Sequence, residues 1–114
     1  GRRTWKSWTT IEVSKVSKNG MRPVHPGEVL REEFMVPLGL SANALAKALN
    51  VPAPRINDVV RGRRGVSADT AMRLARYFGG DARSWLNLQA AYDLRVAEIS
   101  SGKRIAREIS PAAA

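Results

Sequence analysis

The chain has 114 residues, a formal net charge of +9 and no cysteine. This length favours one domain with a compact core and leaves no room for a deep catalytic cleft. The absence of cysteine excludes a disulfide framework and a thiolate metal site. Because no apolar run reaches the ~18 residues of a membrane span and no signal-peptide pattern is present, we expect a cytoplasmic protein.

The N-terminal segment, residues 1–20, is basic, with five basic residues and one acidic residue. It shows no sustained helical or strand period. Trp5 and Trp8 are suited to stack on bases or on a partner, which favours a basic arm. The alternative is an extension upstream of the natural start, because Met21 opens the part of the chain with regular patterning.

A first helix is predicted after His25, because Pro26 suits the first helical turn. We expect this helix to end before Pro37. His25 is the only histidine, and its place beside Pro26 predicts that it caps or flanks the helix. The apolar side of the helix consists of Val29, Leu30, Phe34 and Met35.

Residues 41–62 predict two short helices joined by a tight turn at residues 50–52. Ser41 is placed to cap the first helix, and Gly62 to end the second in a left-handed conformation. The buried stripes are Leu45, Ala46 and Leu49 in the first helix, and Ile56, Val59 and Val60 in the second. Two short helices that turn their apolar faces to a common core are typical of a helix-turn-helix.

A fourth helix is predicted to begin at Ser67 and to end at Gly79-Gly80, and Asp81 is placed to cap a fifth. The stripe of the fourth helix is Ala71, Leu74, Ala75 and Phe78. The fifth helix has two apolar sides: Trp85, Leu88 and Tyr92, and opposite them Leu86, Ala90 and Leu94. The first side completes the core, and the second predicts a homodimer interface. From Ser100 we expect a short basic tail, with Ile105 and Ile109 able to support a last turn or an edge strand.

The second helix of the helix-turn-helix carries the candidate base readers. Arginine can fork onto guanine and asparagine can pair with adenine, so Arg55 and Asn57 are expected to read bases. Asp58 is suited to accept from cytosine, or to hold Arg61 or another arginine by an ion pair. Apolar contact with a thymine methyl is expected at the helix start, from Ala53 and Pro54. An ordinary charged face is the alternative, and the tight turn favours base contact.

Phosphate contacts are expected from the basic cluster after this helix and from the start of the preceding helix. Contacts to the DNA phosphates fix the register of a protein on the duplex without reading its sequence, and helix N-termini bind anions. The predicted phosphate contacts are Ser41, Asn43, Lys47, Arg61, Arg63 and Arg64. A solvated turn is the alternative for the arginines, and an ordinary surface position is the alternative for Lys47.

Several short stretches between residues 21 and 97 form a specific combination. They include HPGEVL (25–30), EEF (32–34), PLGLS (37–41), NALA (43–46), VP (51–52), RIN (55–57), GRRG (62–65), DTA (69–71), RLA (73–75), WLNLQ (85–89) and YDL (92–94). This combination resembles the HigA antitoxins of bacterial toxin–antitoxin pairs, within the lambda-repressor-like (Xre family) class. Ala42, Ala53 and Pro54 depart from that wider class, where glutamines are common, and this departure concerns base reading rather than docking.

The predicted fold is all-α: a five-helix lambda-repressor-like helix-turn-helix domain (21–100) with a basic N-terminal extension (1–20) and a C-terminal tail (101–114). The residues predict a homodimer whose two recognition helices enter successive major grooves of an inverted repeat of double-stranded operator DNA, roughly 34 Å apart. No enzyme activity, cofactor or metal is expected, and no membrane partner. Nucleoid association is expected when the protein is bound to DNA.

The resemblance implies two further roles, which are repression of the protein's own operon and neutralisation of a cognate HigB toxin, a RelE-like ribonuclease that cleaves messenger RNA. It makes the first helix a candidate toxin-binding surface, through Glu28, Glu32 and Glu33, although such acids are usually a solvated face. The alternatives are a stand-alone sequence-specific repressor without a toxin and a protein-interaction module that has lost DNA binding. RNA binding is less favoured, because the basic cluster lacks interleaved aromatic residues.

Overall fold

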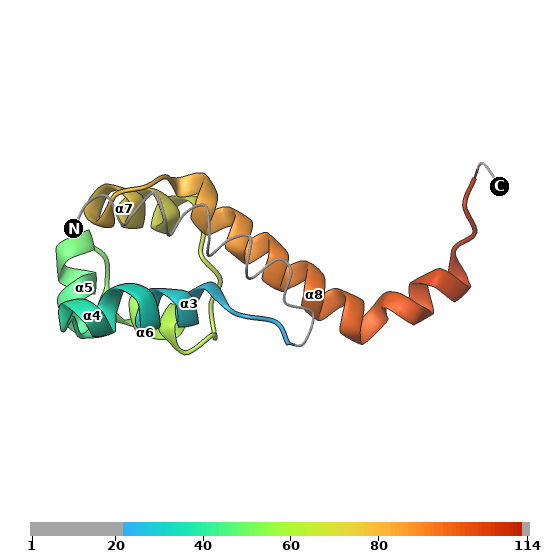
Figure 1. Cartoon of the computed structure of the whole chain (residues 1–114), viewed down its shortest axis with the longest axis horizontal. Helices are drawn as coiled ribbons and strands as arrows, with labels where there is room; N and C mark the ends of the chain where they lie inside the picture. Colours follow the sequence, from blue (N-terminus) through green and yellow to red (C-terminus); the bar gives the residue numbers. More distant parts are fainter. Residues whose placement is uncertain (1–21, 113–114) are drawn as a thin grey trace.

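The computed structural model describes residues 22–112, which form a series of helices (Figure 1). The first helix runs through α3 (Pro26–Val29), η2 (Leu30–Met35) and α4 (Val36–Leu38). It is followed by α5 (Ala42–Leu49), α6 (Ala53–Val60), α7 (Ala68–Phe78) and α8 (Ala82–Glu108). With α3, η2 and α4 taken as one helix, the predicted five-helix, all-α architecture is confirmed. The predicted basic arm, with Trp5 and Trp8, lies outside the described residues.

The start of the first helix is as predicted. Pro26 occupies the first helical turn, and the Nδ1 atom of His25 accepts a hydrogen bond from the backbone N–H of Gly27 at 2.9 Å. Residue 25 therefore caps the helix, in the position where Ser or Asp would normally satisfy an exposed N–H group.

The end of the first helix differs from the prediction, because Pro37 lies inside the helix rather than beyond it. The preceding segment η2 is a π-helix, and the N–H of Val36 donates to the carbonyl of Arg31, five residues back. In a regular α-helix the proline ring would clash with the carbonyl four residues earlier. The wider π turn relieves this clash, and the helix continues to Gly39, which ends it with a φ of 65°.

The helix-turn-helix is built by local hydrogen bonds at each helix end. Ser41 Oγ accepts from the N–H of Ala44 at 3.1 Å, which confirms the predicted cap of α5. Asn50 takes a left-handed conformation with φ 59°, and the N–H of Val51 donates to the carbonyl of Ala46 at 3.0 Å. This Schellman-type ending turns the chain within three residues. Gly62, with φ 76°, lies just past the end of α6, as expected.

The core lies among the first helix, α5, α6, α7 and the start of α8, each of which contributes buried apolar residues to it. The ring centroid of Phe34 lies 4.7 Å from that of Phe78 and 5.4 Å from that of Trp85. The same hydrophobic cluster also contains Val29, Leu30, Met35, Leu45, Ala46, Leu49, Ile56, Val59, Val66, Ala71, Leu74 and Leu88. The helix-turn-helix therefore stands on a rigid base of packed aromatic and aliphatic side chains.

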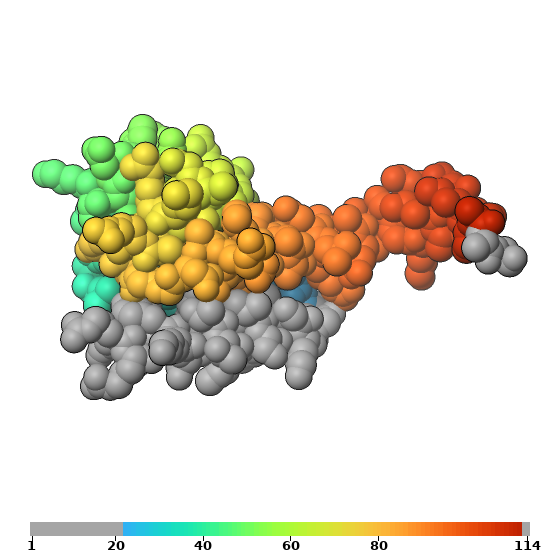
Figure 2. Space-filling view, turned by 90° about the horizontal axis from the view of Figure 1, so that it is seen from above, coloured from blue at the N-terminus to red at the C-terminus, as the bar shows by residue number. Residues whose placement is uncertain are grey.

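Helix α8 is longer than predicted. Asp81 caps it as expected, accepting from the N–H of Ser84 at 2.8 Å. Residues 101–108, where we expected a tail with a last turn or an edge strand, continue the same helix. Gly102 costs a helix only ~1 kcal/mol relative to alanine, and the residues after it are mostly good helix formers. The distal half of α8 projects away from the other helices (Figures 1 and 2).

None of the helices within residues 22–112 is long and apolar enough to cross a membrane.

Candidate nucleic-acid interface

Helix α6 turns its apolar residues inward and presents a polar side outward. Ile56 and Val59 are fully buried. At 100° per residue, the opposite side of the helix carries the predicted base readers Pro54, Asn57 and Asp58. Pro54 is exposed, and Asn57 and Asp58 are half-buried. The outward face of α6 is thus compatible with contact to a nucleic acid.

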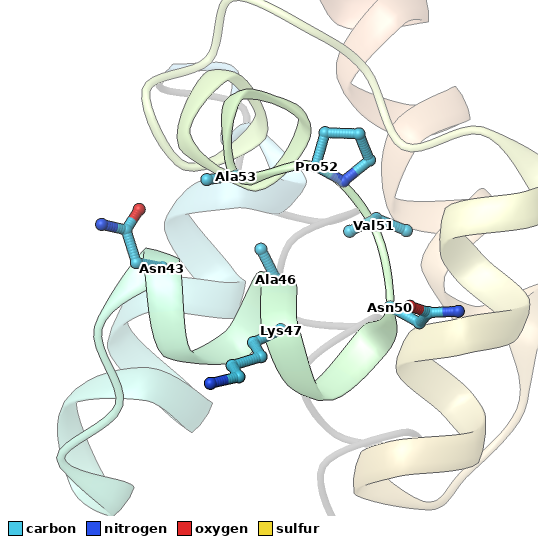
Figure 3. A pocket seen from close by; sticks show the side chains of 7 residues that line it. All are labelled: Asn43, Ala46, Lys47, Asn50, Val51, Pro52 and Ala53. Carbon is cyan, nitrogen blue, oxygen red and sulfur yellow. The ribbon is translucent and has the colours of Figure 1, made fainter.

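A surface groove of about 480 Å³ runs between α5 and the start of α6 (Figure 3). Its lining is Asn43, Ala46, Lys47, Asn50, Val51, Pro52 and Ala53. The Nδ2 atom of Asn57 donates to Oδ1 of Asn43 at 3.3 Å and to the carbonyl of Ala53 at 3.1 Å. The structure therefore brings together two predicted phosphate contacts, Asn43 and Lys47, and two predicted base readers, Ala53 and Asn57.

Arg55 lies elsewhere, on a flank of α6 from which its side chain reaches Asp69 at the start of α7. We expected it on the outward face, but the helical period places it well away from Asn57. Its Nη1 atom donates to Oδ2 of Asp69 at 2.7 Å, and its side chain is only 30% exposed. Arg73 donates through Nε to the same oxygen at 2.8 Å. The hydrogen bonds from Arg73, and after them those from Arg55, lower the pKa of Asp69.

The arginine loop, residues 61–65, follows α6 and exposes Arg61, Arg63 and Arg64. The N–H of Arg63 donates to the carbonyl of Asp58 at 2.8 Å. Its guanidinium Nη1 lies 3.8 Å from the Asp58 carboxylate, with 64% of the arginine side chain exposed. Asp58 thus holds an arginine by an ion pair, as one of the two predicted roles requires. Because the pair is exposed, the arginine can move to a phosphate at little cost.

Gln89 supports the arginine loop from α8, a role that was not predicted from the sequence. Its Oε1 atom accepts from the N–H of Val66 at 2.8 Å, and its Nε2 atom donates to Asp93 at 3.0 Å. A Cβ added at Gly65 would lie 3.0 Å from Cδ of Gln89, so the loop passes closely over this side chain. The only sequence signal for it was its place in the WLNLQ stretch.

His25 supports the same loop through a hydrogen bond with the backbone of Arg64. Its ring packs edge-on against Tyr92, with centroids 4.9 Å apart. Burial lowers the pKa of His25, while the charge of Asp93 and a hydrogen bond with the backbone of Arg64 act in the opposite direction. The neutral ring fits this position, because its unprotonated Nδ1 accepts the N–H of Gly27.

We expect the free energy of unfolding to fall as the pH is lowered from about 6.5. The unfolded chain binds a proton at the ordinary histidine pKa, whereas the folded chain binds it only at lower pH because the pKa of His25 is lowered. The contribution of His25 to the free energy of unfolding is therefore fully present above the pKa of the unfolded chain. It decreases as the pH falls from that value to the lower pKa of the folded chain. Urea denaturation between pH 7.5 and 5 measures this, and His25→Asn, which keeps a capping side chain, should flatten the profile. An unchanged profile in His25→Asn would assign the pH dependence to other groups.

Comparison with known proteins agrees with this geometry. Residues 30–85 match the helix-turn-helix family. The chain is 67% identical over 81 residues to virulence-associated protein I of Dichelobacter nodosus, covering 71% of this chain and 75% of that protein. It is similar to the solved structure of Pseudomonas aeruginosa antitoxin HigA with the higBA promoter, at 53% identity and a TM-score of 0.78, covering 80% of this chain and 99% of that chain. An addiction module antidote protein of a HigA family from Coxiella burnetii is 49% identical, with a TM-score of 0.76 and coverages of 80% and 99%.

Proposed function

Because the chain belongs to the helix-turn-helix family that includes the HigA antitoxins, we propose that it binds operator DNA as a dimer, represses its own toxin–antitoxin operon and neutralises a cognate toxin. The observation that supports the DNA part is the groove lined by Asn43 and Lys47, with Asn57 of α6 hydrogen-bonded to Asn43 at its side. A relative of the same fold, P. aeruginosa HigA, was solved with its promoter. A solvated face needs no such convergence of polar side chains from two helices.

In this mechanism the positive charge of the chain captures the duplex, and α6 then enters the major groove. Asn57 exchanges its hydrogen bonds to Asn43 and Ala53 for two bonds to an adenine. Ala53 and Pro54 contact thymine methyl groups, and Asp58 accepts from cytosine when Arg63 leaves it. The hydroxyl of Ser41 already caps α5, so the start of this helix contacts phosphate through backbone N–H groups. Asn43, Lys47 and the arginine loop supply the other phosphate contacts.

We infer the dimer from the second apolar side of α8. Leu94 is 62% exposed and Ala90 is exposed, whereas Leu86 already packs partly against the protomer's own core. An exposed apolar stripe on a helix is typical of an interface between protein chains. A twofold axis through α8 would present two α6 helices to an inverted repeat, with half-sites one helical turn apart.

The toxin part of the proposal rests on the likeness to antidote proteins. The partner that we infer is a HigB-like ribonuclease of the RelE type, and the acids of the first helix are the candidate contact surface. Glu32 and Glu33 are exposed, with Glu32 paired to Arg31 at 2.9 Å, and Glu28 is paired to Arg22 at 2.8 Å. Exposed pairs of this kind exchange readily for a basic partner.

Co-expression with the product of the neighbouring gene tests the toxin part. We expect the neighbour to encode a small basic ribonuclease that stops growth, and we expect this chain to restore growth and to co-purify with it. A neighbour that has no effect on growth would favour the alternative of a stand-alone repressor. Glu32→Lys with Glu33→Lys should abolish rescue while operator binding persists, because these acids lie outside the groove.

Replacing Arg63 or Arg64 by Ala should weaken binding to operator and to scrambled duplex alike. A phosphate contact carries no sequence information, and each one lost should reduce the slope of log K against log salt by about 0.9. Fluorescence anisotropy over a salt series measures both quantities. Arg107→Ala removes the same charge from the last turn of α8 and is the matched control. A loss confined to the operator would make these arginines base readers instead.

A further inference from the structure

Residues of α7, outside the helix-turn-helix, connect its two helices across the turn by hydrogen bonds. Oδ2 of Asp69, near the start of α7, accepts from Arg55 of α6 at 2.7 Å and from Arg73 of α7 at 2.8 Å. Arg73 also donates through Nη1 to the carbonyl of Leu49 at 2.9 Å and lies 3.5 Å from the carbonyl of Asn50. One connected network therefore joins the end of α5 to the start of α6.

Each end of this network lies where a helix end needs support. The last carbonyls of α5 have no partner within the helix, and a guanidinium is a favourable partner at this negative end. Helix α6 begins after Pro52, whose side chain makes no capping hydrogen bond. Its start is therefore not fixed by local chemistry in the way that Ser41 fixes the start of α5. Arg55, in the first turn of α6, supplies a link to Asp69 instead.

We propose that Asp69 and Arg73 are positioning residues for DNA recognition, because through Arg55 they set the angle of α6 against α5. This inference rests on the proposed operator binding. The proposed DNA contacts lie on the two helices that the network connects, with the phosphate contact Asn43 on α5 and the base reader Asn57 on α6. A change of angle between these helices misplaces both sets of contacts at once. Arg55 then acts through Asp69 and not by contact with a base.

The network should affect the angle between α5 and α6 more than the free energy of unfolding. Asp69 is 57% exposed, and exposed ion pairs add little to folding. Specificity is more sensitive, since base contacts require side chains in fixed places. Arginine at 73 is also required in particular, because its fork bonds to Asp69 and to the Leu49 carbonyl together. A lysine offers a single ammonium group and cannot reproduce this geometry.

The test is a double-mutant cycle of Arg55→Ala and Asp69→Ala, read as the ratio of operator to scrambled-duplex affinity. We expect each variant to reduce this ratio by about 3- to 30-fold, and the double variant to be no worse than either. The loss should spread over the half-site in a panel of operators with single base-pair changes. Arg73→Lys should act in the same direction. Glu98→Ala, which removes an exposed acid paired to Arg95 on α8, is the control and should bind as the parent does.

The direction in which Asp69→Ala changes the affinity for operator DNA separates a positioning role from a simple effect of charge. Removing a carboxylate makes the chain more positive, so charge alone predicts tighter binding to every duplex. Circular dichroism at the assay temperature checks that each variant is folded. Asp69→Ala with an unchanged ratio would overturn the inference, and so would Arg55→Ala with a loss at a single base pair. If the parent chain itself binds operator and scrambled duplex equally, the proposed function fails. That outcome is distinct from a parent that prefers the operator and an Asp69→Ala variant with the same preference, which overturns only the inference.

Discussion

Replacing Gly27 by Ala is expected to destabilise the domain by ~1–3 kcal/mol, and by more if the helices cannot adjust. Gly27 lies in α3, where the helix crosses the end of α6, and an added Cβ would overlap the carbonyl oxygen of Val59 and lie 2.7 Å from its carbonyl carbon. Both are backbone atoms, so the overlap is relieved only if α3 moves off α6. Urea denaturation followed by circular dichroism measures the loss.

Gly102→Ala provides the matched control, because nothing lies within 4 Å of a Cβ at that position in α8. There the substitution should leave the free energy of unfolding unchanged or raise it by up to ~1 kcal/mol, since alanine is the better helix former. Equal stability of Gly27→Ala and the parent chain would contradict the close packing of α3 on α6. The glycine of HPGE therefore has a packing role that does not involve DNA.

Replacing Asn57 by Ala is expected to weaken operator binding by ~1–3 kcal/mol, which corresponds to about a 5- to 150-fold loss. The loss should be confined to one base pair in each half-site, because a side-chain amide distinguishes adenine by two hydrogen bonds. Binding to scrambled duplex should change little, since no charge is removed. Anisotropy with a panel of singly substituted operators measures the profile.

Asn87→Ala is the control for this substitution, because it removes an exposed asparagine from α8, outside the groove. It should bind all duplexes as the parent chain does. A uniform loss in Asn57→Ala would instead show that this side chain supports the groove through its bond to Asn43. In that case base reading would fall to Pro54 and Asp58 on the same face.

The helix boundaries that could be predicted are those set by residues close in sequence. Ser41, Ser67 and Asp81 each accept from an N–H three residues ahead. Gly79 and Gly80 adopt the left-handed φ angles that only glycine takes without strain. Capping chemistry of this kind is local, so the sequence alone indicates it.

The features that could not be predicted depend on contacts across the fold. Pro37 stays helical because η2 widens the turn before it, and the Ser-Ser-Gly stretch at 100–102 stays helical although it resembles a break. The bond from Arg55 to Asp69 joins residues fourteen positions apart on different helices. Its residue type and its place in the second helix made Arg55 a candidate for base contact, and only the position of Asp69 at the start of α7 shows that its side chain has another partner.

Whether the chain binds its own promoter specifically is the central question, and fluorescence anisotropy with DNA from upstream of its gene tests it most directly. We predict a preference of ~1,000-fold or more over a scrambled duplex at physiological salt, with two chains bound per site. Binding that is equal for both duplexes and falls steeply with salt would contradict this account, because it would show that the charge of +9 supplies non-specific attraction alone.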